Sequence, residues 1–318
     1  CLILNKTINK EIIMNNLKKI GLTALGTTLI ASSAFAAEMS VTGAASISFD
    51  QTSDKVGGSN VYMGDSLNFK ANGEMDNGVT VAVAYEIDGG ALDDHSITFG
   101  FTEMGTLRFG GHGDGTSLSS MDDKTPNAYE ESWDIVAGKP TVINGDSGNN
   151  SFKYTSADLG GATITTAFVN ATNYLDFGIT MTPEMVDGLT IGYARGETQD
   201  RTLATNVDVT ESTMYAKYVV GSATVGYQVS EADSPTAGGS LDSKAMGISY
   251  AVTSDFSVAY NTHKLDKEND SDEQKASGIS ASYTSGSMTI GGAKNKVDNV
   301  ANGATDVEGY EMTLSFAF

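Results

Sequence analysis

The sequence predicts an all-β fold, a transmembrane antiparallel up-and-down β-barrel of about 16 strands. Apolar and polar residues alternate with a period of two along most of the chain. The polar face of these segments consists mainly of Ser, Thr, Gly, Ala and Asn, which suits a barrel with lipid outside and a wet lumen inside. Short turns rich in Gly, Asp and Asn alternate with longer acidic connections, as expected for antiparallel hairpins that cross a membrane.

The first residues of the chain predict export from the cytoplasm. Lys18 and Lys19 form a basic start, residues 21–33 supply a short apolar stretch, and Ala34-Phe35-Ala36 fits a small-x-small cleavage site. These are the three parts of a secretory signal peptide, and the apolar stretch is shorter than the about 20 residues of a membrane-spanning helix. We therefore expect residues 14–36 to be cleaved.

The rest of the chain is expected to form one domain. Residues 1–13 precede Met14 and do not fit the signal pattern, so we interpret them as a gene-model extension and assign residues 37–318 to the barrel. Cys1 is the only cysteine, whereas small secreted domains are usually held together by disulfides. A large barrel closed by backbone hydrogen bonds does not need them.

The net negative charge of the chain argues against nucleic acid as a partner. The chain has a formal charge of −21, and its first 36 residues hold four of the 19 basic and one of the 40 acidic side chains. Residues 37–318 therefore carry a formal charge of −24. Binding to nucleic-acid phosphates needs clusters of Lys and Arg, so we expect no nucleic-acid partner.

The alternation marks sixteen segments, most of them near the about 9–11 residues that a tilted membrane-spanning strand needs. In the first segment, Met39, Val41 and Ile47 alternate with serines and threonines. The predicted strands are 39–50, 65–75, 79–88, 94–102, 106–113, 150–157, 162–170, 174–182, 189–199, 211–220, 223–231, 244–253, 256–265, 276–284, 288–297 and 307–318. Sixteen is an even number, as bacterial single-chain barrels have.

The connections between these segments differ in length. Seven are short, and several of them contain Asn-Gly, Asp-Gly or Gly-Gly, which are hairpin-turn residues. The other eight are mostly longer and acidic: 51–64, 89–93, 114–149, 171–173, 200–210, 232–243, 266–275 and 298–306. Two of these eight are short, so the alternation is a tendency. The longest connection, 114–149, is the third of the long set.

The last segment is an apolar strand that ends on an aromatic residue. Tyr310, Met312, Leu314, Phe316 and Phe318 alternate with small or polar residues. An ordinary edge strand with this much apolar surface would invite aggregation. The segment looks like the C-terminal assembly signal of outer-membrane β-barrel proteins, with Phe318 as its terminal residue.

Three stretches together resemble the family of Gram-negative general diffusion porins: the opening strand MSVTGAASISFD (39–50), residues 67–114, and the closing strand. The resemblance implies an outer-membrane, multi-pass barrel surrounded by lipid and inserted by the barrel-assembly machinery. It implies a homotrimer of water-filled pores for passive diffusion of small hydrophilic solutes and ions, with no cofactor. It also implies a long third extracellular loop that folds into the pore, which matches the rank and length of 114–149.

The resemblance also predicts a charged constriction. Porins of this family oppose basic residues of the barrel wall to carboxylates of the inserted loop. Strand parity points Lys70, Arg108, His112 and Lys153 toward the lumen. The loop offers Asp114, Asp122, Asp123, Glu130, Glu131 and Asp134. The family's basic cluster is usually denser, and acids here outnumber bases, so we expect the pore to prefer cations.

The remaining patterns leave a few alternatives open. The acidic run 266–273 could hold Ca²⁺, but it lacks the spacing of an EF-hand loop and also fits a solvated loop tip. The three histidines lack metal-ligand spacing, and no serine lies in a G-x-S-x-G motif, so we expect neither a metal site nor an enzyme. The alternatives to a general pore are a substrate-selective channel on the same barrel and a secreted acidic β-sandwich or adhesin.

Overall fold

The computed structural model describes residues 38–53, 60–135, 142–146, 149–200 and 207–318. The predicted signal peptide and the extension before it lie outside the described residues. In the part of the chain that is described, no helix has the length and hydropathy needed to cross a membrane.

The sheet is a closed barrel of sixteen strands, and every strand pairs antiparallel with the strands before and after it. The strands are β1 (Glu38–Thr52), β2 (Asn60–Glu74), β3 (Thr80–Asp88), β4 (Ala91–Phe101), β5 (Gly105–His112), β6 (Ser151–Thr155), β7 (Ala162–Val169), β8 (Tyr174–Met181), β9 (Leu189–Asp200), β10 (Val207–Val220), β11 (Ala223–Asp233), β12 (Leu241–Ala251), β13 (Phe256–Lys267), β14 (Gln274–Ser285), β15 (Met288–Asp298) and β16 (Val307–Ala317). Two short 3-10 helices complete the described elements, η1 (Ser119–Met121) and η2 (Val300–Asn302). The predicted fold class is therefore confirmed.

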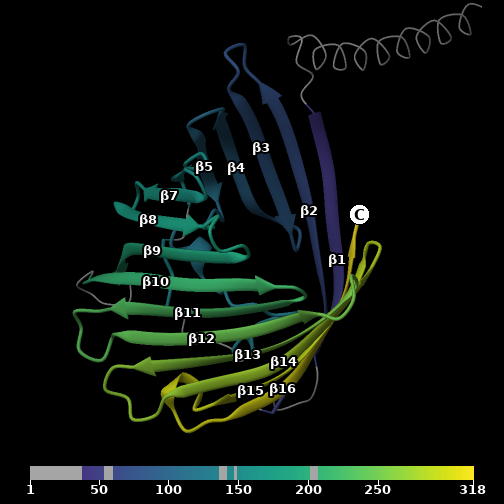
Figure 1. Ribbon diagram of the computed structural model, residues 1–318, viewed down its shortest axis with the longest axis vertical. Helices are drawn as coiled ribbons and strands as arrows, with labels where there is room; N and C mark the ends of the chain where they lie inside the picture. Colours follow the sequence, from purple (N-terminus) through teal and green to yellow (C-terminus); the bar gives the residue numbers. More distant parts are fainter. Residues whose placement is uncertain (1–37, 54–59, 136–141, 147–148, 201–206) are drawn as a thin grey trace, which may run out of the picture.

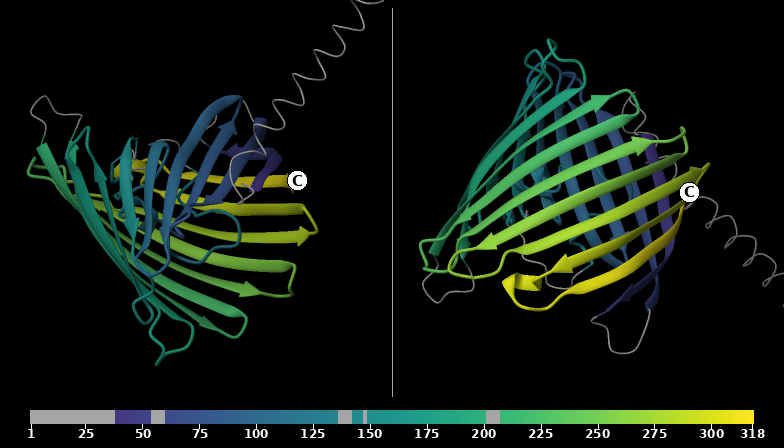
Figure 2. Two further views of the ribbon diagram at one scale, coloured as in Figure 1. Left: turned by 90° about the horizontal axis from the view of Figure 1, so that it is seen from above. Right: turned by 60° about the horizontal axis from the view of Figure 1, so that its bottom comes forward.

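The barrel closes where its first and last strands meet, as the ribbon views show (Figures 1 and 2). Ala44 lies opposite Ala317, and the pairing continues one step further, because the Phe318 N–H donates to the Gly43 carbonyl oxygen at 2.9 Å. A Cβ on Gly43 would lie 2.6 Å from the Phe318 ring, so glycine lets this ring lie against the backbone of β1. Closure removes the exposed sheet edges that would otherwise pair with other chains.

The short turns have the geometry that their residues predict. Gly78, Gly188 and Gly221 have φ of +80°, +81° and +59°, which side chains with a Cβ rarely adopt. The predicted strand ends agree with the observed ones to within a few residues. The largest difference is at β2, which begins at Asn60 instead of 65, because Val61 and Met63 continue the outward alternation.

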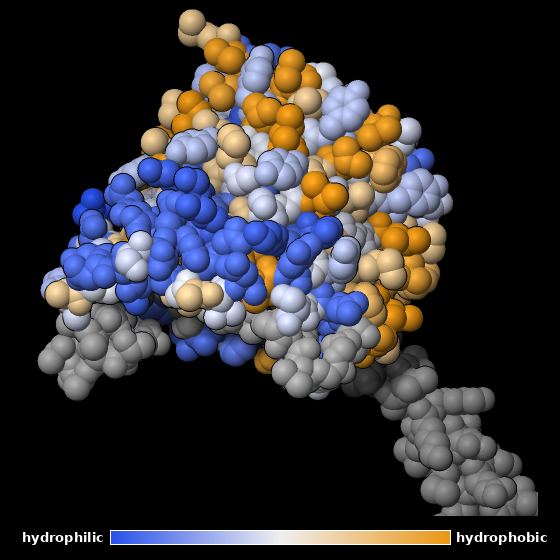
Figure 3. Space-filling model, turned by 90° about the horizontal axis from the view of Figure 1, so that it is seen from below, coloured by the Kyte–Doolittle hydropathy of each residue, from blue (hydrophilic) through white to orange (hydrophobic). Residues whose placement is uncertain are grey.

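The two faces of the strands differ as lipid and lumen require. On β13, Tyr260 is 45% exposed on the outer face, whereas the next residue, Asn261, is 2% exposed on the inner face. Seen from below, apolar residues cover much of the barrel wall, and hydrophilic residues gather on one side of this view (Figure 3). An apolar outside with a polar inside is the pattern of a membrane barrel.

The inner face is itself divided into two parts. Many inward side chains of β8 to β15 are buried, including Asp176, Gln228, Asn261 and Ser280. Inward side chains of β2, such as Lys70 and Asn72, are exposed. Something inside the barrel therefore covers β8 to β15 and leaves β2 open.

Candidate pore constriction

The third loop covers this part of the inner wall. It follows β5 and returns to β6, and its described residues contact inward side chains of strands from β8 to β16. The loop contains η1, and the two views of Figure 2 show chain segments of its colour within the barrel.

Two buried carboxylates hold the two ends of the loop. The Leu118 N–H donates to Asp176 Oδ2 at 2.7 Å, and the Gly145 N–H donates to Glu211 Oε2 at 2.8 Å. Asp176 and Glu211 are each 2% exposed and stand on the inner faces of β8 and β10. Hydrogen bonds from backbone N–H groups to a carboxylate are stronger than neutral ones, which fixes the loop at both ends.

Wall side chains also hold the middle of the loop. The Lys124 N–H donates to Gln228 Oε1 at 2.7 Å, and Gln228 Nε2 donates in turn to the Met121 carbonyl oxygen at 2.8 Å. Three further contacts follow along the wall: Ala128 N–H to Ser280 Oγ, Tyr129 hydroxyl with Thr313 Oγ1, and Ser132 N–H to Asn261 Oδ1. These buried polar groups of the wall thus find hydrogen-bond partners in the loop, as burial favours.

Glycines of the wall make room for the loop. Where the loop passes, the inward position of the strand is repeatedly a glycine, and a Cβ there would collide with a loop atom. A Cβ on Gly226 would lie 2.5 Å from Pro126 Cδ, and one on Gly309 would lie 2.7 Å from Ile135 Cδ1. The set, here named the glycine track, is Gly178, Gly226, Gly247, Gly278, Gly291 and Gly309.

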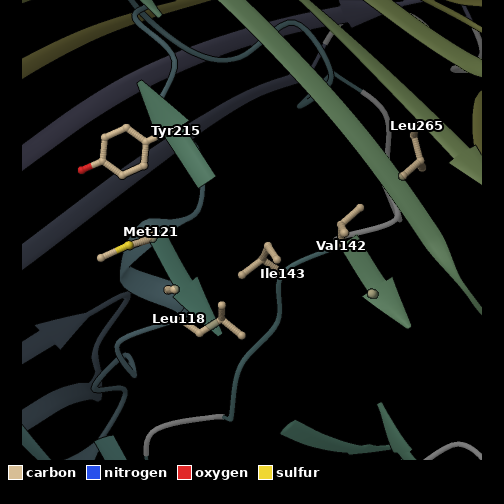
Figure 4. Packing of buried hydrophobic residues seen from close by; sticks show 8 residues of the cluster. Leu118, Met121, Val142, Ile143, Tyr215 and Leu265 are labelled. Carbon is tan, nitrogen blue, oxygen red and sulfur yellow. The ribbon is translucent and has the colours of Figure 1, made fainter. Parts of the chain in front are cut away.

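Apolar side chains of the loop add two small cores inside the barrel. In the first, Leu118, Met121 and Ile143 pack with Tyr215 and Leu265 of the wall (Figure 4). In the second, the loop residues Trp133 and Ile135 pack with wall residues that include Ala245, Ala276, Val297 and Val307. The Trp133 ring also lies 4.4 Å from the His263 ring. Burying these side chains favours the docked loop, at about 25 cal/mol for each Å² of apolar surface removed from water.

The predicted basic wall residues have different surroundings. Lys70 is exposed on the inner face of β2. Arg108 Nε lies 2.8 Å from Asp114 Oδ1 at the start of the loop, and Lys153 Nζ donates to the Gly115 carbonyl oxygen at 2.8 Å. The loop therefore engages two of the basic side chains that were expected to face it.

His112 does not point into the lumen, as the parity of its strand had predicted. A register shift between His95 and Ser96 places His112 opposite His95, with Gly111 as the extra residue of a bulge. The His95 ring stacks on Tyr85, an exposed outward residue. A bulge reverses the alternation, so His112 does not share the face of Arg108, and its Nδ1 contacts the Asp93 carbonyl oxygen.

The six predicted loop acids differ in their exposure to solvent and in their contacts. Asp114 is 6% exposed and pairs with Arg108. Asp123 is exposed and has a positive φ of 48°. The other four keep part of their surface accessible: Asp122, Glu130, Glu131 and Asp134.

The acidic run over 266–273 shows local pairing. Glu273 Oε2 lies 3.4 Å from both Lys264 Nζ and Lys275 Nζ, and Glu268 accepts from the Gly238 N–H. Among the described residues, the carboxylates that converge within 4.8 Å of one another are those of Glu86, Asp93 and Asp94, at the other side of the barrel.

Sequence reasoning missed the residues that hold the loop. Asp176, Glu211 and Gln228 could be placed on the inner face by strand parity, but nothing local distinguishes them from other lumen-facing polar residues. The glycine track is weakly visible in the sequence. Glycine is unfavourable inside a strand, so its presence there can mark a site where another part of the backbone approaches closely.

A closed antiparallel barrel with an apolar outside, a polar inside and one loop packed within it defines an outer-membrane β-barrel channel. The chain belongs to the Gram-negative porin family, whose family model matches residues 21–275. It is accordingly a multi-pass protein of the outer membrane.

Solved structures share this fold at low sequence identity. A loop L8 deletion mutant of OmpT, an outer membrane protein of Vibrio cholerae, is 14% identical with a TM-score of 0.69, covering 89% of this chain and 99% of that one. A triple mutant of the Rhodopseudomonas blastica porin is 15% identical with a TM-score of 0.64, covering 88% and 100%. A comparison with curated proteins found no match.

Proposed function

We propose that the protein is a homotrimeric, water-filled channel for passive diffusion of small hydrophilic solutes and ions, with a preference for cations. The observation that carries this proposal is that the third loop covers only one part of the inner wall of the barrel. The loop packs on β8 to β16, while Lys70, Asn72 and Glu74 of β2 remain exposed on the inner face. The aqueous path would run between the loop and the β1 to β5 part of the wall.

The charges around this path support the cation preference. Arg108 is paired with Asp114, and the ammonium of Lys153 donates to a loop carbonyl. Partly accessible carboxylates remain on both sides, on the loop at Glu130 and on the wall at Glu86. A lining with surplus negative charge attracts cations and repels anions.

The test is single-channel recording in a planar bilayer, with the protein extracted from outer membranes. Ohmic steps in groups of three, with a reversal potential of cation sign under a KCl gradient, are expected. Replacing Asp122 and Asp123 with Lys should move the reversal potential toward the anion side. Folded protein without channel activity would overturn the proposal, and saturable current block by one solute would favour a substrate-selective channel instead.

We also propose that the chain is processed after Ala36. The basic, apolar and small-x-small segments of residues 14–36 support this. Protein isolated from the outer membrane should give an N-terminal sequence that starts at Ala37. An N-terminal sequence that starts earlier would contradict the proposed processing.

A further inference from the structure

Four short turns of the barrel repeat one pattern, an acidic residue followed by a large apolar residue. They join β2 to β3, β4 to β5, β6 to β7 and β8 to β9, so they follow one another along one edge of the barrel. Short turns of bacterial barrels face the periplasm. The four pairs, here named the acidic turn rim, are Glu74-Met75, Glu103-Met104, Asp158-Leu159 and Glu184-Met185.

The apolar side chains of the acidic turn rim are open to solvent. The exposed fractions are 44% for Met75, 64% for Met104, 58% for Leu159 and 96% for Met185. Tyr154, on the outer face of β6, donates its hydroxyl to the Met104 carbonyl oxygen. Outward tyrosines mark the level at which the apolar belt of a barrel meets water. Met104 therefore lies at the watery border of the belt and not within it.

The turns of the other half of the barrel have a different composition. β10 is joined to β11 by Gly221-Ser222, and β14 is joined to β15 by Gly286-Ser287. In the turn between β12 and β13, Asp255 precedes Phe256, which belongs to β13 and is half-buried. Contact with the inner leaflet would act on all seven short turns. A pattern confined to four consecutive turns therefore indicates a partner that covers one side of this edge.

The acidic turn rim carries negative charge without compensation. Two further acids bring its exposed carboxylates to six: Glu74, Asp76, Glu103, Asp158, Glu184 and Asp187. Over the part of the chain that is described, none of the six forms an ion pair. The seven short turns contain no Lys or Arg, so the same edge of a second copy would bring only like charges. Lipid phosphates would be repelled for the same reason.

Hydrogen bonds between neighbouring turns hold the rim in position. The Thr182 N–H donates to the Gly161 carbonyl oxygen at 2.6 Å, which ties the third turn of the rim to the fourth. The Val219 N–H donates to the Gly188 carbonyl oxygen at 2.9 Å, which ties the fourth turn to β10. A surface that is already ordered loses little conformational entropy when a partner binds.

We propose that the acidic turn rim is a docking surface for a periplasmic protein segment in which basic residues alternate with apolar ones. The basic side chains of the segment pair with the six carboxylates, and its apolar side chains cover the methionines and Leu159. Methionine is flexible and adapts to an irregular apolar partner. The four turns span roughly 30 Å, which is the length of about nine extended residues. The surface lies outside the pore, so the proposal does not depend on which solutes pass.

The test measures binding of a synthetic peptide to the full protein in nanodiscs of zwitterionic phosphatidylcholine, by fluorescence anisotropy. The probe is a nine-residue peptide of alternating Lys and Leu, and a peptide of alternating Glu and Leu is its charge-reversed counterpart. Binding to empty nanodiscs is subtracted. The unmodified protein should bind the basic peptide and not the acidic one. Glu74→Gln/Glu103→Gln/Glu184→Gln should bind the basic peptide about tenfold more weakly.

The matched control removes three exposed acids near the long loops, in the variant Glu231→Gln/Asp233→Asn/Asp242→Asn. It changes the net charge equally and should bind the basic peptide as the unmodified protein does. Met104→Ser/Met185→Ser leaves the charge unchanged and should also weaken binding, because the apolar contacts are lost. Heat-dependent gel mobility checks that every variant is folded.

Three results would overturn the proposal. The first is an equal loss of binding in the control, which would show that the peptide responds only to the total charge. The second is unchanged binding in Met104→Ser/Met185→Ser, or a change of its oligomeric state, which would assign the methionines to contacts between copies. The third is cosedimentation with purified peptidoglycan that the rim variants lose while they still bind the peptide, which would make the cell-wall polymer the partner.

Discussion

At the scale of single residues, wall and loop are fitted to each other at positions with no local sequence signature. A glycine on the inner face of a strand leaves the sheet unchanged but allows the loop to approach the backbone. A carboxylate on the inner face, such as Asp176 or Glu211, supplies the acceptor that a buried N–H group of the loop needs. Both kinds of residue contact loop residues that lie more than 50 positions away along the chain.

Adding a methyl group to the glycine track should displace the loop. In Gly247→Ala, the new Cβ would overlap the carbonyl oxygen of Pro126, and overpacking of this kind costs about 1–3 kcal/mol. We expect a changed single-channel conductance with an intact barrel. Gly73→Ala is the control, because no atom lies within 4 Å of a Cβ there. An unchanged conductance in Gly247→Ala would show that the loop does not control the passage.

A second residue-scale prediction concerns the phenol of Tyr129. Burial raises the pKa of Tyr129 to about 12, while its hydrogen bond to Thr313 acts in the opposite direction. The neutral phenol is favoured in the folded protein, so its contribution to stability is complete below about pH 10. It should be lost as the pH rises toward 12. The difference in absorbance at 295 nm between the unmodified protein and Tyr129→Phe should rise near pH 12, and a rise near pH 10 would contradict a buried phenol.

At the scale of elements, the third loop behaves as a packed segment with its own small cores. Its two ends are anchored on carboxylates, its middle on amides and hydroxyls, and its apolar side chains fill the space above the glycine track. Loops usually run over the surface, because a buried loop must satisfy its backbone polar groups. Here the polar inner wall of the barrel satisfies them.

Removing one anchor should loosen the loop without unfolding the barrel. Glu211→Ala leaves the N–H groups of Asn144 and Gly145 without their acceptor, which costs about 1–3 kcal/mol for a buried group. We expect noisier open-channel current and faster proteolysis within the loop. Glu197→Ala, at an exposed position on β9, should behave as the unmodified protein. Quiet current in Glu211→Ala would contradict the anchoring role.

At the scale of the whole molecule, stability comes from closure of the sheet. Each strand has two neighbours, and the last strand is completed by Phe318, whose backbone pairs with Gly43 while its ring lies over that glycine. The proposed assembly signal and the closing contact are thus the same residue.

Changing Phe318 should reduce the amount of assembled barrel. Phe318→Asp places a charge on the outer face at the seam, where a charge near lipid is unfavourable. We expect less heat-modifiable, folded protein in outer membranes, measured by gel electrophoresis of unheated samples. Phe316→Tyr, an exposed position on the same face, should assemble normally. Normal assembly of Phe318→Asp would refute the role of this residue.

The sequence by itself determined the barrel. Membrane-spanning strands must alternate between lipid and water. The period of two therefore runs along most of the sheet, and the number of strands, the positions of the turns and the outward face could be read from it. Prediction weakened where the alternation is interrupted, as at the bulge beside His112, or continues past an expected end, as at Asn60.

Only the tertiary structure decided how the interior is used. The contacts of the loop with Asp176, Glu211 and the glycine track join residues far apart in the chain. Along the sequence these residues look like any other small or polar residue that faces the lumen. Lys244, Lys264 and Lys275 are likewise separated along the chain and become neighbours only through strand register. Periodicity is a local property that each strand carries alone, whereas register and loop packing arise only when the sheet has closed.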